Sequence, residues 1–159
     1  MKTTLLSFAL FFSTILFSQN KPYDDVAAIK EVIQEAYVDG IFNEGYMRSI
    51  ELSFSEHFES IGLLENDETI VETYQDWVDL VKKRTNEGYY PVPPSEHVTV
   101  KYLHVEVSRT VANVKLEFLV GGVPKYIDFL ALYKFSGGWK IVNRTYHAID
   151  EADRKKTKN

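Results

Sequence analysis

Residues Tyr126 to Tyr146 read YIDFLALYKFSGGWKIVNRTY, a pattern typical of a β-hairpin. Two runs rich in β-branched and aromatic residues flank Ser136-Gly137-Gly138, which predicts two antiparallel strands joined by a tight turn. Side chains alternate between the two faces of a strand. One face of the first strand carries an acid among aliphatic residues, and the other face is apolar and aromatic. The first set is Asp128, Leu130 and Leu132, and the second is Phe129, Ala131, Tyr133 and Phe135.

The length of the turn decides which residues of the second strand share the Asp128 face. A two-residue loop adds Trp139, Ile141, Asn143, Thr145 and His147 to that face, whereas a three-residue loop reverses the pairing. The two-residue register predicts a concave pocket wall that contains Asp128, Asn143, His147 and Trp139 among aliphatic neighbours.

Upstream of the hairpin, Val98–Ser108 and Val111–Val120 have the same strand-like composition, with turn residues between them. A shorter apolar run predicts a strand over His57–Leu64. The helices are expected earlier in the chain. Helices followed by a meander of long strands predict one α+β domain, with the helices packed on one face of a curved, mostly antiparallel sheet.

Asp24 is the predicted N-cap of the first helix, and Gly40 is its predicted end. The apolar face of this helix comprises Val26, Ile29, Ile33, Ala36 and Tyr37. A shorter helix is predicted within Tyr46 to Phe54.

A later helix shows the clearest start signal. Thr69 and Glu72 fit a capping box, and Gly88 is the predicted stop. Its apolar stripe comprises Ile70, Tyr74, Trp77, Val78 and Val81. Three prolines within Tyr89 to Pro94 predict a loop between this helix and the strands.

The hairpin resembles the D-[FY]-L-x-L-x-K…G-x-W-K-I-V-N-[KR] segment of the putative lumazine-binding group within the NTF2-like superfamily. Asp128 to Lys134 and Gly138 to Arg144 carry the resemblance. Phe54 to Phe58 stands where those proteins carry F-H-P-D, although the His falls later here and the Pro is missing. The resemblance implies an NTF2-like cone fold, which hosts both enzymes and binding proteins, so the fold alone does not specify the activity.

Composition excludes several classes of function. The formal net charge of -5 argues against nucleic acid as a partner, because binding phosphates normally requires a basic surface. The chain has no cysteine, which excludes disulfides, thiolate catalysis and Cys-ligated zinc. The histidines show no metal-ligand spacing, and we expect neither a metal nor a cofactor.

The N-terminus has the pattern of a signal peptide. Lys2 precedes an apolar stretch from Leu5 to Phe17, which is too short to span a bilayer, and Ser18 is a small residue suited to the position before cleavage. We expect a signal peptide over residues 1–19, a domain over 20–150 and a basic tail over 151–159. The mature chain is then periplasmic or extracellular and has no membrane span.

Five residues are candidates for ligand binding: His57, Trp77, Asp128, Asn143 and Tyr37. Asp128 in a pocket wall would have a raised pKa and could move a proton, but it would equally serve as a structural partner of Arg144 or Arg84. His57 suits either a pocket mouth or a local hydrogen bond. The rings of Trp77, Tyr37 and Tyr74 are suited to stacking on a flat heterocycle, and also to a core.

The preferred hypothesis is an exported protein that binds a small molecule in an apolar cavity without catalysis. One alternative is an acid/base enzyme of the isomerase, dehydratase or cyclase type, with Asp128 or His57 as the base. Another is a pure interaction module. We also expect a homodimer through the convex face of the sheet, because Phe129, Tyr133, Val142 and Tyr146 would make that face apolar.

Overall fold

The computed structural model describes residues 24–64 and 67–149. The predicted signal peptide and basic tail lie outside these ranges. The helical elements are α1 (Asp25–Val32), η1 (Ile33–Asn43, a π-helix), α2 (Met47–Ser53) and α3 (Tyr74–Asn86). The strands are β1 (Phe54–Leu63), β2 (Thr69–Thr73), β3 (Val98–Ser108), β4 (Val111–Val120), β5 (Val123–Phe135) and β6 (Gly138–Ala148).

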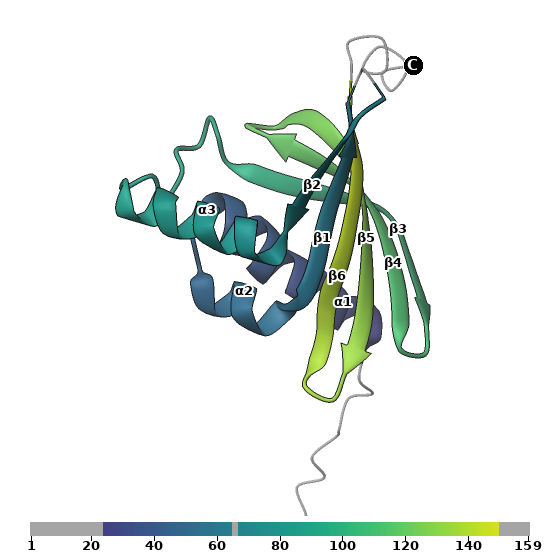
Figure 1. The fold of residues 1–159 in the computed structure, drawn as a ribbon. Helices are drawn as coiled ribbons and strands as arrows, with labels where there is room; N and C mark the ends of the chain where they lie inside the picture. Colours follow the sequence, from purple (N-terminus) through teal and green to yellow (C-terminus); the bar gives the residue numbers. More distant parts are fainter. Residues whose placement is uncertain (1–23, 65–66, 150–159) are drawn as a thin grey trace, which may run out of the picture.

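The strands form one sheet of six, in the order β2-β1-β6-β5-β4-β3. The pairing of β1 with β6 is parallel and the other pairings are antiparallel. The sheet is strongly curved, and α2 and α3 lie to one side of it (Figure 1). Buried side chains from α1, η1 and α3 pack with those of the inner face of the sheet in one core cluster. The predicted α+β class and the cone-like architecture are confirmed.

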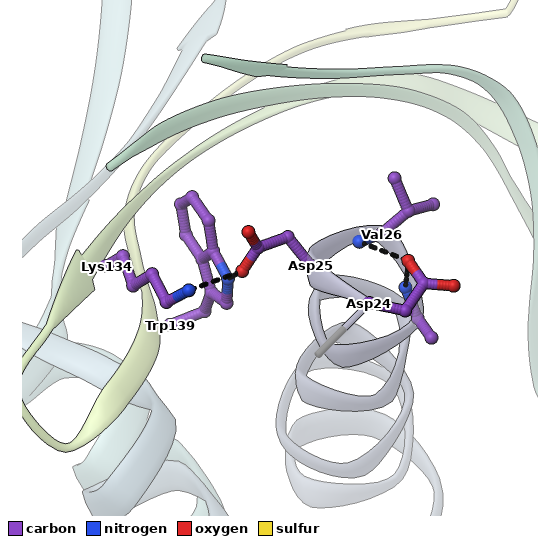
Figure 2. Close-up of polar contacts among 6 residues, drawn as sticks. Asp24, Asp25, Val26, Lys134 and Trp139 are labelled. Atoms are coloured by element: carbon purple, nitrogen blue, oxygen red, sulfur yellow. Dashed lines mark hydrogen bonds and ion pairs between the residues drawn. The ribbon is translucent and has the colours of Figure 1, made fainter. Parts of the chain in front are cut away.

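The first helix begins as predicted but ends later. Asp24 accepts hydrogen bonds from the backbone N–H groups of Val26 and Ala27, which caps α1 (Figure 2). Gly40 does not end this helix, because α1 continues directly into η1. Gly45, with a φ of 71°, follows the end of η1 instead. Gly40 instead permits close packing, since a Cβ there would lie 3.0 Å from Cγ1 of Ile50 in α2.

The predicted start of the later helix is wrong by one turn. Thr69 begins β2, and the capping box is formed by Thr73 and Asp76. Leu63 of β1 pairs with Thr69, so the β-branched run after Thr69 extends the sheet, and strand pairing overrides the local capping signal. Gly88 follows α3 with a φ of 70°, as predicted.

A polar cluster attaches the start of α1 to the β5–β6 hairpin. Asp25 Oδ1 accepts hydrogen bonds from Lys134 Nζ at 2.7 Å and from Trp139 Nε1 at 2.9 Å (Figure 2). These two hydrogen bonds lower the pKa of Asp25 below its ordinary value. No helix within the described ranges is long and apolar enough to cross a membrane.

Candidate functional site

An open cavity of about 240 Å³ lies between the helical layer and the inner face of the sheet. It is lined from η1, β2, α3, β4, β5 and β6. The lining residues are Ile41, Phe42, Glu72, Trp77, Leu80, Arg84, Phe118, Tyr126, Arg144 and Tyr146. Half of these lining residues are aromatic. Three charged side chains also line the cavity: the acidic Glu72 and the basic Arg84 and Arg144.

Arg144 is the buried cation of this wall, with 6% of its side chain exposed. Its Nη2 donates to Asp128 Oδ1 at 2.9 Å, and its Nη1 donates to Ser60 Oγ at 3.1 Å. The third guanidinium nitrogen, Nε, has no hydrogen-bond partner within the described part of the chain. Burial alone lowers the pKa of Arg144, but Tyr37 and Asp128 outweigh burial and raise it, so the guanidinium stays charged.

Asp128 lies directly behind Arg144 and is fully buried. Its second carboxylate oxygen accepts a hydrogen bond from the hydroxyl of Tyr37 in η1. Burial, together with the Asp128 charge, raises the pKa of Tyr37 well above its ordinary value. Both oxygens of Asp128 are thus engaged, one by a cation and one by a phenol.

Four aromatic rings surround the guanidinium of Arg144. Its Cζ lies 3.7 Å from the centre of the Tyr146 ring and 5.9 Å from each of the other three ring centres. Those three rings belong to Tyr37, Trp77 and Tyr126. The Tyr146 ring reaches across the neighbouring strand β1 at Gly62, where a Cβ would lie 2.6 Å from the ring. Only a glycine leaves room for this ring position.

Glu72 and Arg84 bring one negative and one positive side chain to the same cavity. Glu72 lies at the end of β2, and Arg84 lies in the last turn of α3. Arg84 also stacks on Tyr89, with its Cζ 5.0 Å from the ring centre.

The structure brings together only some of the predicted site residues. Trp77 lines the cavity, and Tyr37 and Asp128 lie behind its wall. His57 lies elsewhere, with 88% of its side chain exposed, in a hollow of about 780 Å³ that Tyr74 also lines. His57 and Asp128 therefore share no cavity.

The predicted alignment of β6 is correct only at its start. The turn is a two-residue loop, because Phe135 pairs with Gly138, and Trp139 and Ile141 are buried on the inner face. A β-bulge at Val142 then shifts the register, so Leu130 pairs with Arg144 and Asp128 pairs with Tyr146. One extra residue reverses the face of every residue that follows.

Because of the bulge, the predicted faces of four residues are wrong. Asn143, Thr145 and His147 leave the Asp128 face, and the Asn143 side chain donates instead to the backbone oxygen of Glu59 on β1. Tyr146, expected on the outer face, lies on the inner face against Arg144. Arg144 and Tyr146 are therefore the site residues that strict alternation missed. The sequence does carry a signal for these two residues. Large side chains occupy odd positions at Trp139 and Ile141 and even positions at Arg144 and Tyr146, and such a change indicates an extra residue in the strand.

Within residues 24–64 and 67–149, no three His, Cys, Asp or Glu side chains lie close enough together to hold a metal ion. The interior charges of the site are instead balanced by one another, through the ion pair of Arg144 and Asp128.

Comparison with known proteins identifies the family of the chain. The sequence profile of a family described as putative lumazine-binding matches residues 24–147. A search of curated proteins finds no match.

Solved structures of NTF2-like proteins share the fold. The similar structures include an NTF2-like protein of unknown function from Silicibacter pomeroyi, with 19% identity and a TM-score of 0.61, covering 78% of this chain and 95% of that one. An NTF2-like protein of unknown function from Methylobacillus flagellatus is 21% identical with a TM-score of 0.59, covering 82% and 97%. An NTF2-like protein from Cytophaga hutchinsonii is 14% identical with a TM-score of 0.60, covering 80% and 100%. At these identities the likeness establishes the fold.

Proposed function

The chain belongs to the putative lumazine-binding family of NTF2-like proteins, and we propose that it binds a small, flat ring compound in the cavity beside Arg144. One observation carries the proposal: aromatic side chains and a buried cation converge on a single open cavity. Ligand sites characteristically combine apolar and aromatic walls with a few placed polar groups.

The size of the cavity limits the ligand. Cavities for drug-sized ligands have volumes of roughly 300–1,000 Å³. The volume of about 240 Å³ here is smaller and suits a compound of one or two rings. Trp77, Tyr126 and Tyr146 supply ring surfaces against which such a compound can pack.

Binding without catalysis has better support than the acid/base alternative. A general base must reach the proton that it removes, yet both oxygens of Asp128 already accept hydrogen bonds from Tyr37 and Arg144. His57 faces a different hollow and offers no second catalytic group to this cavity.

Isothermal titration with lumazine as the probe tests this function. Leu80→Trp places a larger side chain in the cavity wall, and we expect it to abolish the binding seen with the wild type. Leu52→Trp is the matched control, because Leu52 lies on α2 and is 53% exposed, so binding should be retained. Equal binding by both variants, each with native circular dichroism, would place the ligand outside this cavity.

Export is the second part of the proposal. It is supported by the apolar stretch from Leu5 to Phe17, which suits a signal peptide and is too short to span a bilayer. The intact mass of protein from the exported fraction should correspond to loss of about 18 or 19 residues, the length of the predicted signal peptide. A full-length chain in the membrane fraction would contradict cleavage.

A homodimer through the outer face of the sheet is the third part. Phe129, Tyr133 and Phe135 on β5 are 46%, 48% and 47% exposed. Polar residues border them on β4 and β6, namely Asn113, Lys115, Asn143 and Thr145. The bulge has moved Tyr146 to the inner face, so on the β6 side the apolar strip is narrower than expected from alternation. An apolar centre with a polar border is the usual anatomy of a protein interface.

A further inference from the structure

We infer that the cavity selects an uncharged ring compound that carries a carbonyl-type acceptor at its edge, such as a lactam. The inference rests on the proposed binding function and specifies the chemical class of the ligand. Two features of the wall carry it: the balance of its charges and Nε, the one guanidinium nitrogen of Arg144 that has no hydrogen-bond partner in the described part of the protein.

The charges at the cavity cancel. Arg144 is neutralised by Asp128 at 2.9 Å, and Arg84 and Glu72 bring one further charge of each sign to the lining. A charged ligand would add an unbalanced charge to a partly enclosed space, where water compensates it poorly. An anion would in addition compete with Asp128 for the same guanidinium. The wall therefore favours a ligand without net charge.

The Nε–H group of Arg144 specifies an acceptor on that ligand. Nη1 and Nη2 already donate to Ser60 and Asp128, whereas Nε donates to no group in the described part of the protein. A buried N–H without a partner is unfavourable, and an acceptor that reaches it removes that cost. An exocyclic carbonyl oxygen, which has two lone pairs, is such an acceptor.

The Tyr146 ring sets the direction of approach. It covers one face of the guanidinium at 3.7 Å, and the Nε–H bond lies in the plane of that group, so an acceptor approaches it edge-on. An oxygen in the plane of a flat ring suits this edge-on geometry. Glu72 is an acceptor when ionised, so it favours a ligand that also presents an N–H. A lactam carries both groups side by side.

Three ring-matched probes test the inference by isothermal titration: quinolin-2-one, naphthalene and 2-naphthoate. We expect quinolin-2-one to bind about tenfold or more tightly than either of the others, since a hydrogen bond to a charged donor contributes on that scale. Equal affinity for naphthalene would contradict polar selection, and tighter binding of 2-naphthoate would contradict selection of an uncharged ligand. In both cases the cavity still binds a ring compound, so the proposed function stands. If none of the probes binds, the proposed function fails and the inference fails with it.

The double variant Asp128→Leu/Arg144→Met assigns the preference to Arg144. It removes both charges together, because removing one partner would leave the other buried and unpaired. We expect it to bind quinolin-2-one and naphthalene with about equal affinity, as the hydrogen bond to Nε is lost. His57→Gln lies outside the cavity and should keep the wild-type preference.

A spectroscopic measurement on the wild type is independent of whether that variant folds. Arginine labelled with ¹⁵N at Nε gives a resonance for the Nε–H group of Arg144. We expect quinolin-2-one to shift this resonance strongly downfield and naphthalene to shift it weakly. An unmoved resonance at saturating quinolin-2-one would overturn the inference.

Discussion

The guanidinium of Arg144 lies 3.7 Å from the ring centre of Tyr146, two residues further along the same strand. Both side chains occupy the inner face of β6, and the Tyr146 ring extends over Gly62 on β1, its partner in the sheet. The absence of a side chain at Gly62 is thus a requirement for the shape of the cavity.

Gly62→Ala tests this requirement. Its Cβ would lie 2.6 Å from Tyr146 Cζ, so the ring must move, and we expect a loss of about 1–3 kcal/mol in the free energy of unfolding, as for other overpacked sites. Gly137→Ala is the control, since nothing lies within 4 Å of its Cβ position. Urea titrations compare the two variants. Equal stabilities would show that Tyr146 adjusts without cost.

The ion pair between Asp128 and Arg144 is expected to stabilise the native state. Asp128→Asn leaves the Arg144 charge buried without a counter-charge, and the free energy of unfolding should fall by about 3–5 kcal/mol. Asp79→Asn, at an exposed position of α3, should cost less than about 0.5 kcal/mol. Urea unfolding measures both. A small loss at Asp128, comparable to that at Asp79, would contradict the structural role of the pair.

Most of the fold follows from residues whose preferences agree with their final environment. The alternation of β5 places Asp128, Leu130 and Leu132 inside and Phe129 and Tyr133 outside, as the pattern predicts. Local signals also identify Asp24 as a cap and Gly88 as the stop that follows α3. In these positions local and tertiary preferences coincide.

The errors arise where tertiary contacts override local signals. The run after Thr69 has a valid capping pattern, but its β-branched side chains pair with β1 instead. Val142 is a good strand residue, so its own identity does not mark it as a bulge, and only the change of phase between Trp139 and Tyr146 does. The bulge places both Ile141 and Arg144 on the inner face, which uninterrupted alternation cannot do. A site built on a bulge is therefore difficult to locate by alternation alone.

Alkaline pH should destabilise the protein partly through Tyr37. Because burial raises the pKa of Tyr37 above its ordinary value of 10.0, the neutral phenol stabilises the native state fully below pH 10. This contribution is lost as the pH rises from 10 through the native-state pKa.

Tyr37→Phe isolates this contribution. Its free energy of unfolding should fall less steeply above pH 10 than that of the wild type, although the overall stability is lower because the hydrogen bond to Asp128 is missing. A residual slope is expected from Tyr102, whose pKa burial raises to about 12. Identical slopes in the two proteins, measured by denaturant titration, would exclude a contribution from Tyr37.

The proposed dimer is tested at the centre of the β5 strip. Tyr133→Glu would bury an unpaired carboxylate in the interface, so the variant should be monomeric. Tyr46→Glu, at the N-cap position of α2 and 53% exposed, is the control and should leave the assembly unchanged. Light scattering at micromolar concentration gives the mass of each. A monomeric wild type would contradict the dimer.

The cavity beside Arg144 is expected to hold a small molecule, and native mass spectrometry of the protein purified from its own source detects such a molecule whatever its identity. We predict that the wild type carries an additional small mass that is released on denaturation. The Leu80→Trp variant, in which a larger side chain fills part of the cavity, should lack this mass, and Leu52→Trp should retain it. A wild type with only the mass of the polypeptide, or a Leu80→Trp variant that retains the additional mass, would contradict the account.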